Sequence, residues 1–294
     1  MMEVIHELLG YNRIKIIQND EMFSFSLDSI LLANFVETTL KTNKIIDLGC
    51  GNAPIPLYLT LKTNAKIIGV EIQKEIADMA KRGVELNGLG EQIEIINDDL
   101  KGIYLKVQAN TFDIVVSNPP YFKVHKESNL NKNDYLTIAR HEVMATLDDI
   151  VVEAKKLLVD GGSLYLVHRA ERIEDIFVTM SKHNMVVKKL QFVYSKKSSS
   201  NALAVLIQAK KNKNSGLKVL QPIYAYDDNG KYTEEIKKIF NFKWKYKVCY
   251  NITIRRHDYV FKFIIKRRKV LFYRFNYKTC FSRWCCKRNW NASN

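Results

Sequence analysis

The stretch Lys44-Ile-Ile-Asp-Leu-Gly-Cys-Gly51 decides the fold. Its first part, Lys44 to Leu48, is a short apolar run typical of a buried strand. Gly49 and Gly51 follow at once, and because glycine has no Cβ they allow a tight turn and the close approach of a ligand. The next residues, Pro54 to Leu61, predict a helix with a proline in its first turn. A strand, a glycine-rich turn and a helix in this order indicate an α/β protein.

The same alternation continues along the chain. Further strands are predicted over 66–71, 92–97, 112–117 and 163–167, and helices over 73–87, 147–158 and 173–183. Strands 186–194 and 202–209 have only a seven-residue polar connector, which is too short for a parallel crossover, so they should pair antiparallel. We therefore expect a Rossmann-like parallel sheet of seven strands whose last two form an antiparallel hairpin. Ligands of such sheets bind at the carboxyl ends of the strands.

Positive charge is concentrated at one end of the chain. The net charge is +15, of which residues 1–240 contribute +1 and residues 241–294 contribute +14. The segment 241–294 also holds 14 aromatic residues, all three Trp and four of the five Cys, without Gly or Pro. Basic and aromatic residues together are typical of an RNA-binding arm. We favour the alternative that this segment is disordered or results from a frameshift or read-through of an A/T-rich gene, with a domain boundary near Phe240.

Composition and length exclude several classes of protein. A chain of 294 residues is long enough for a sizeable core. It has no apolar run of about 18 residues and no apolar region near Met1, so we expect neither a membrane span nor a signal peptide. Five Cys without a framework spacing fit a reducing compartment, and we expect a cytoplasmic location. The His and Cys residues have no metal-ligand spacing, so we predict no metal.

Four acidic residues stand where the predicted strands end. Asp47 precedes the glycine turn and suits a cationic ligand, although the turn alone is also compatible with a plain strand–helix connection. Glu71 ends the second strand about 20 residues further on, where an acid binds ribose hydroxyls. Of Asp98 and Asp99, one can accept from an adenine amino group and the other can cap the next helix; we favour Asp99 as the ligand. Together these residues predict S-adenosylmethionine as the cofactor.

The motif Asn118-Pro-Pro-Tyr121 ends the fourth strand and is the most specific signal in the chain. The amino group of adenine is planar because its lone pair is delocalised into the ring. The Asn118 side-chain carbonyl and the Pro119 backbone carbonyl can each accept one N–H, which favours a pyramidal nitrogen aimed at a methyl group. Pro119 and Pro120 stiffen the loop, and Tyr121 offers a ring on which an extruded base stacks.

Residues 1–240 resemble the bacterial tRNA1(Val) (adenine-N6)-methyltransferase family, whose members are Class I methyltransferases. Four segments carry the resemblance: Gln18 with Phe23-Ser-Phe-Ser-Leu-Asp28, Asp47 to Gly51, Asn118-Pro-Pro-Tyr-Phe122, and Ala139-Arg-His-Glu142. The resemblance implies a domain over residues 1–240 that transfers a methyl group from S-adenosylmethionine to adenine N6 beside the anticodon of a valine tRNA. The enzyme would bind tRNA and no membrane or metal, and we favour a monomer.

The resemblance also assigns roles to individual residues. The cofactor-binding set would be Phe25, Asp28, Asp47, Gly49, Gly51, Glu71, Asp98 and Asp99. Residues Asn118, Pro119, Pro120 and Tyr121 would hold the target base. Phe122 and Arg140 would contact the substrate, although Arg140 could instead form a salt bridge at a helix start. Apart from the resemblance, the expected topology brings Lys196 and Lys197 near the cofactor end of the sheet, where either could contact phosphate or belong to a solvated loop. Ala53 departs from the pattern, because the glycine motif often has a further Gly there.

Four other functions stay open at this point. An Asn-Pro-Pro-Tyr motif also occurs in protein glutamine N5-methyltransferases that act on release factors. It also occurs in amino-methyltransferases of DNA, and an rRNA substrate is a further alternative. A non-catalytic RNA-binding module that retains the fold is the alternative from another class.

Overall fold

The computed structural model describes residues 3–8, 11–19, 26–119 and 145–240, and three strands between residues 250 and 276. The chain divides into two compact units, Met1–Phe242 and Lys243–Asn294. Each unit is described by itself.

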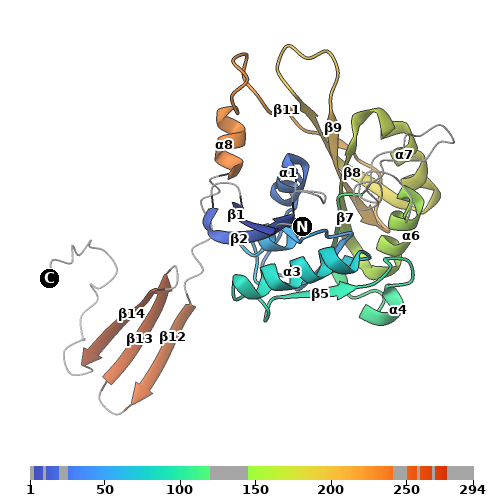
Figure 1. Cartoon of the computed structure of the whole chain (residues 1–294). Coiled ribbons are helices and arrows are strands. Elements are labelled where there is room, and N and C mark those ends of the chain that lie inside the picture. Colours follow the sequence, from blue (N-terminus) through green and yellow to red (C-terminus); the bar gives the residue numbers. More distant parts are fainter. Residues whose placement is uncertain are drawn as a thin grey trace. The chain divides into compact units, whose positions relative to one another are not determined.

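The first unit contains a nine-stranded sheet with the order β10-β8-β9-β7-β6-β3-β4-β5, in which β11 also pairs with β8 (Figure 1). Its strands are β3 (Lys44–Leu48), β4 (Lys66–Glu71), β5 (Ile93–Asn97), β6 (Phe112–Ser117), β7 (Leu158–Arg169), β8 (Met185–Tyr194), β9 (Ala204–Lys211), β10 (Lys218–Val219) and β11 (Ile223–Tyr224). The helices are α1 (Leu27–Phe35), α2 (Pro54–Leu59), α3 (Lys74–Leu86), α4 (Tyr104–Val107), α6 (Leu147–Leu157), α7 (Ile173–Lys182) and α8 (Glu234–Phe240), with a 3-10 turn at Ala170–Arg172.

The strand order confirms the predicted sheet. β3 pairs parallel with β4 on one side and with β6 on the other. The chain therefore adds β4 and β5 on one side of β3 and then returns to add β6 and β7 on the other side. Binding sites of open α/β sheets form at such a reversal. β9 pairs antiparallel with both β7 and β8, which confirms the terminal hairpin. The two-residue strands β10 and β11, which lie parallel to β8, were not predicted.

Both faces of the sheet are buried, because alternate residues of each strand contact different helices. Ile45 of β3 belongs to the core cluster that includes α1, α2 and α3. Its neighbour Ile46 belongs to a second cluster, which includes α6 and α7. This double burial explains why β3 reads as a nearly continuous apolar run rather than an alternating one.

An antiparallel hairpin of β1 (Glu3–Leu8) and β2 (Tyr11–Asn19) joins the first core cluster through residues such as Ile16. The end of β2 is fixed to the glycine turn, since Asn52 Nδ2 donates to the Ile17 carbonyl at 2.8 Å. This hydrogen bond therefore holds the end of β2 close to the start of α2.

Helix α8 lies at the C-terminal end of the first unit and packs into the first core cluster. Ile236, Ile239 and Phe240 are all buried in that cluster, and Tyr58 Oη donates to the Ile239 carbonyl at 3.2 Å. The ring of Phe240 also packs edge-on against Tyr232, with centroids 5.0 Å apart. The last helical turn before residue 241 is therefore part of the core.

The second unit contains three antiparallel strands in the order β12 (Tyr250–Arg256), β13 (Tyr259–Lys266) and β14 (Lys269–Asn276). Each strand pairs with the next over its whole length. The origin of the segment 241–294 and the boundary at residue 240 stay predictions. Sequencing the gene across the Phe240 codon tests the origin, and truncation tests the boundary.

We expect truncation after Phe240 to preserve folding, cofactor binding and turnover. The reason is that the described core and the glycine turn all lie before that residue. As a matched control, truncation after Thr233 removes the three buried α8 side chains and should cost several kcal/mol, since each large core side chain contributes roughly 2–5 kcal/mol. Thermal unfolding and kcat/KM of both variants provide the measurement. A loss of more than about tenfold in kcat/KM after truncation at Phe240, worth about 1.4 kcal/mol, would show that the segment 241–294 contributes to catalysis.

No helix in the described part of the chain is both long enough and apolar enough to span a bilayer.

Candidate active site

Three strand ends meet at the carboxyl edge of the sheet. Gly49 N and Cys50 N both donate to the Val70 carbonyl at 2.9 Å, which joins the glycine turn after β3 to the end of β4. On the other side, the buried Ser117 Oγ donates to the Leu48 carbonyl at 2.7 Å, which joins the end of β6 to β3. The glycine turn is therefore fixed from both neighbouring strands.

The predicted tight turn at Gly49 and Gly51 has a left-handed backbone. Gly49 and Gly51 have φ angles of 74° and 55°, and a Cβ built on either would meet no atom within 4 Å. The space beside the turn is therefore open to a ligand. Ala53, the departure from the family pattern, also has a positive φ of 66°, although it is not a glycine. This conformation costs an alanine about 1–2 kcal/mol, part of which burial of its methyl group offsets.

The side chain of Glu71 holds the glycine turn through a hydrogen bond. One carboxylate oxygen accepts from Gly51 N and the other from Gln73 N, both at 2.9 Å. The side chain is buried, and this burial raises the pKa of Glu71, against the opposing effect of the backbone hydrogen bonds from Gln73, Gly51 and Ile72. A carboxylate accepts up to four hydrogen bonds, so Glu71 retains capacity for ligand hydroxyls.

Asp47 is fully buried at the end of β3, and neither of its carboxylate oxygens has a hydrogen-bond partner among the described residues. Burial raises the pKa of Asp47 well above its ordinary value, and the nearby negative charge of Glu71 raises it further. An unpaired buried carboxylate beside a second acid is costly unless a cation or hydrogen-bond donors complete it. The site therefore fits a ligand that carries positive charge and several donors.

Three further buried side-chain atoms in the described part of this unit have no hydrogen-bond partner. They are Nε2 of Gln18, Oγ of Ser26 and Oε1 of Gln73. Gln18 follows Ile17, whose carbonyl is held by the glycine-turn residue Asn52. Gln73 is held by Glu71, and Ser26 stands immediately before α1. A ligand that supplies both donors and acceptors would satisfy this set. Gln18 and Ser26 belong to a segment that carries the family resemblance, but sequence reasoning assigned a role to none of the three residues, because isolated Gln and Ser residues give no pattern of their own.

Asp98 and Asp99 follow β5 and are half-buried. Asp98 forms an ion pair with Lys106 and accepts from Asp99 N, and the hydrogen bond with Lys106 is the main cause that lowers the pKa of Asp98. Asp99 accepts from Lys101 N at 2.9 Å, a turn-capping contact. Both acids therefore have local partners, and the choice of Asp99 as adenine ligand stays a prediction.

Asn118 lies directly after β6, and its side chain reaches α1. Nδ2 of Asn118 donates to Oγ of the buried Ser29 at 3.1 Å, and the next residue, Pro119, is buried. Asp28 lies beside Ser29 in the first turn of α1. The structure thus brings Asn118, Asp28 and the glycine turn to one edge of the sheet. The predicted residues Phe25, Pro120, Tyr121, Phe122 and Arg140 lie outside the described residues.

Lys196 and Lys197 lie in the connector between β8 and β9, at the same edge of the sheet. Their neighbourhood includes Arg169, which ends β7 and pairs with Ala204 at the start of β9. Arg169 Nε is buried without a hydrogen-bond partner in the described residues, and its ion pair with Glu171 is long, at 4.0 Å. Arg169 was not predicted from the sequence.

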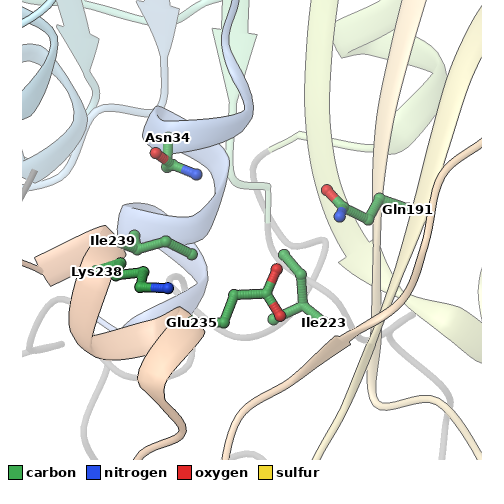
Figure 2. Close-up of a pocket in the computed structure, with 6 residues that line it drawn as sticks. All are labelled: Asn34, Gln191, Ile223, Glu235, Lys238 and Ile239. Carbon is green, nitrogen blue, oxygen red and sulfur yellow. The ribbon is translucent and has the colours of Figure 1, made fainter. Parts of the chain in front are cut away.

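A separate cavity of about 540 Å³ lies elsewhere in this unit. Figure 2 shows its lining, which comes from α1, β8, β11 and α8: Asn34, Gln191, Ile223, Glu235, Lys238 and Ile239. It contains none of the predicted site residues. Among the residues that the structure describes, no group of three or more His, Cys, Asp or Glu side chains is arranged to hold a metal ion.

The fold and this edge of the sheet define a methyltransferase. Residues 13–198 match the family model of the methyltransferase small domain, and the chain belongs to that family. S-adenosylmethionine is its cofactor, which confirms the prediction and fits the open glycine turn and the unpaired Asp47 carboxylate.

Two curated relatives and one solved structure show which proteins this chain is similar to. The chain is 25% identical over 217 residues to the tRNA1(Val) (adenine(37)-N6)-methyltransferase of Shewanella halifaxensis, which covers 71% of this chain and 87% of the relative. It is 30% identical over 149 residues to the enzyme of the same name from Porphyromonas gingivalis, covering 49% and 57% of the two chains. The crystal structure of a predicted O-methyltransferase from Agrobacterium tumefaciens superposes with a TM-score of 0.58 at 20% identity, over 73% of this chain and 96% of that one. This likeness supports the fold.

Proposed function

We propose that the protein transfers a methyl group from S-adenosylmethionine to the exocyclic N6 of an adenine in tRNA, beside the anticodon of a valine tRNA. The observation that carries the proposal is the position of Asn118, which follows β6 next to the strand whose glycine turn receives the cofactor. The names of the curated relatives specify the same substrate. Since tRNA is the substrate, we place the reaction in the cytoplasm, with a monomer as the active form.

The proposed chemistry needs no general base before methyl transfer. The Asn118 side-chain carbonyl and the Pro119 backbone carbonyl each accept a hydrogen bond from one N–H of the target amine. These two hydrogen bonds localise the lone pair on the nitrogen. The lone pair attacks the methyl carbon, the bond from that carbon to sulfur breaks, and the product amine then loses a proton to water. The chain's own contribution is therefore positioning and the acceptance of hydrogen bonds.

Incubation with S-adenosylmethionine that carries a labelled methyl group tests the proposal. Bulk tRNA and a bacterial release factor serve as the competing substrates, and mass spectrometry of nucleosides identifies the product. We expect N6-methyladenosine in tRNA. Label in the release factor and none in tRNA would overturn the proposal in favour of glutamine methylation, and binding of RNA without affinity for the cofactor would favour a non-catalytic module.

We further propose that Arg169, Lys196 and Lys197 bind phosphates of the RNA. Arg169 is the last residue of β7, three residues beyond Leu166, which pairs with Ser117 at the end of β6. The connector that holds both lysines follows β8 at the same edge of the sheet. Lys197 is exposed and Lys196 half-buried. All three basic residues therefore lie where β7 and β8 end, at the same edge of the sheet as Asn118, and positive charge at that edge favours RNA phosphates.

Removal of one charge from this row should weaken tRNA binding without slowing the chemical step. We expect Lys197→Ala to raise KM for tRNA about threefold to fivefold and to reduce the salt dependence of binding by about one unit of slope. Lys41→Ala is the matched control, because Lys41 is exposed in the turn before β3, at the opposite edge. Equal effects of the two substitutions would show that only the overall charge matters.

A further inference from the structure

Gln18 has a buried side chain that the described fold does not use. It is the penultimate residue of β2 and is 8% exposed, and its Nε2 has no hydrogen-bond partner among the described residues. Its backbone pairs with Val4 of β1, which needs no particular side chain. A buried amide without a partner destabilises a protein, because it has lost the hydrogen bonds that water would supply. The side chain of Gln18 therefore calls for a ligand.

The strand places the Gln18 side chain on the face of β2 that packs against the core. Successive side chains of a strand point to opposite faces, so Gln18 shares the face of Ile16 and not that of Ile17. Ile16 belongs to the first core cluster, which also contains Cys50 of the glycine turn. Ile17 packs instead with two residues of α3. The unpartnered amide thus lies on the same side of the hairpin as the cluster that includes the turn.

A hydrogen bond fixes this end of β2 beside the glycine turn. Nδ2 of Asn52, the residue after Gly51, donates to the Ile17 carbonyl at 2.8 Å. That carbonyl belongs to the peptide group that joins Ile17 to Gln18. Asn52 is buried, so water competes little for this bond. Gln18 is therefore one residue away from a direct contact with the turn, whose Gly51 N is held by Glu71.

The chemistry of the cofactor indicates which of its groups Gln18 fits. S-adenosylmethionine carries an ammonium and a carboxylate on its amino-acid end, besides the sulfonium and the ribose hydroxyls. Asp47 and Glu71 suit the cationic groups and the hydroxyls, but both acids repel the carboxylate, which needs a donor without negative charge. An amide supplies a donor and an acceptor. In either orientation of its amide, Gln18 can therefore pair with the amino-acid end, through the carboxylate or through the ammonium.

We propose that Gln18 is a cofactor-binding residue that pairs with the amino-acid end of S-adenosylmethionine. The hairpin of β1 and β2 then forms one wall of the cofactor site, although β1 lies outside residues 13–198, the range of the family model. The inference goes beyond the proposed function, because it does not depend on which molecule accepts the methyl group.

Calorimetry with three ligands tests the proposal. S-adenosylmethionine and S-adenosylhomocysteine both have the amino-acid end, whereas 5′-methylthioadenosine lacks it and retains the adenosine and the sulfur. We expect Gln18→Ala to raise the dissociation constants of the first two ligands about tenfold and to change that of 5′-methylthioadenosine by less than about twofold. Equal losses for all three ligands, or an unchanged dissociation constant for S-adenosylmethionine, would overturn the proposal.

Thermal unfolding of the ligand-free protein provides a readout that a purely structural role would move in the opposite direction. Gln18→Met retains a side chain of similar length without a polar group, so it removes the unsatisfied amide from the buried site. We expect it to raise the midpoint of unfolding and to weaken S-adenosylmethionine about as much as Gln18→Ala does. A lower midpoint with unchanged affinity would mean that the amide serves the fold and not the ligand. If Gln18→Ala does not fold, the comparison of the three ligands is made with Gln18→Met.

Ile5→Ala is the matched control in the same hairpin. Ile5 pairs with Ile17 across the two strands and is 56% exposed, so its truncation perturbs the hairpin without a change of charge or of the buried face. It should leave all three dissociation constants unchanged. Equal effects of Ile5→Ala and Gln18→Ala would show that the stability of the hairpin matters and the amide does not. None of these measurements includes tRNA, so their outcome is separate from that of the proposed function.

Discussion

Asn118→Ala is expected to leave affinity for S-adenosylmethionine intact and to lower kcat by roughly 10²-fold or more, the scale for loss of one polar contact in a transition state. The physical reason is that different residues hold Asn118 and the glycine turn in place. Asn118 is held from α1 by Ser29, whereas the glycine turn is held from β4 by Glu71. Loss of the amide therefore removes an acceptor for the target amine without releasing the turn.

Calorimetry with the cofactor and single-turnover kinetics with tRNA measure the two quantities separately. Asn118→Asp is the informative companion, because it retains a carbonyl-type acceptor but cannot donate to Ser29. It should retain more activity than Asn118→Ala. Equal losses of cofactor affinity and kcat in Asn118→Ala would contradict the assigned role and place the residue in the cofactor site.

Asp47→Asn should weaken cofactor binding and stabilise the ligand-free protein at the same time. Replacement of the buried carboxylate removes a charge-assisted contact to the cationic cofactor, worth about 1.5–3 kcal/mol, or roughly 10-fold to 100-fold in the dissociation constant. In the absence of ligand the same carboxylate is buried, unpaired and close to Glu71, so its neutralisation should raise the free energy of unfolding by about 1–3 kcal/mol.

The pH dependence provides an independent check of this prediction. Because the pKa of Asp47 is raised in the folded state, the folded protein binds this proton more tightly than the unfolded chain does. Between the ordinary and the raised pKa, a fall in pH should therefore favour folding of the ligand-free protein through this group and weaken binding of the cation. Asp47→Asn should lose both effects.

Asp113→Asn serves as the matched control for Asp47→Asn. Asp113 also belongs to the central strands, but its carboxylate accepts from Asn43 N and Lys44 N at the opposite edge of the sheet. It should leave cofactor affinity unchanged at every pH. If Asp113→Asn and Asp47→Asn weakened binding equally, the effect would reflect total charge rather than the position of Asp47.

The parts of the fold that the sequence predicts are those whose signals are local. The run from Lys44 to Gly51 contains a strand, its end and two positions that favour positive φ within eight residues, and the structure has each of them. The seven-residue connector after Tyr194 likewise fixed the antiparallel pairing of β8 and β9. The strands β10 and β11 are two residues long, too short to show any periodicity, so sequence reasoning had no means to find them.

The residues of the candidate site likewise fall into two groups, those with a local sequence signal and those without one. Asp47 and Glu71 were identified because each stands at a strand end at a known distance from the glycine turn, although their roles as ligands stay predictions. Ser29 and Arg169 carry no such signal, since a serine in a helix and an arginine after a strand are common everywhere. Their relevance comes from contacts or strand register over long sequence distances, which only the assembled sheet reveals.

The segment that includes β10 and β11 covers the outer edge of β8 and so affects how two copies of the chain can associate. Along the outer side of β8, Leu220 N and Ala225 N donate to the Leu190 and Tyr194 carbonyls, and Gln191 Nε2 donates to the Gln221 carbonyl. An exposed strand edge is a template for pairing with a second chain, and short covering strands are one way in which proteins prevent this. A second copy could pair with β8 itself only by displacing residues 218–225. Association of two copies by strand addition is therefore disfavoured at β8, and within the described sheet β5 is the outermost strand that remains for it.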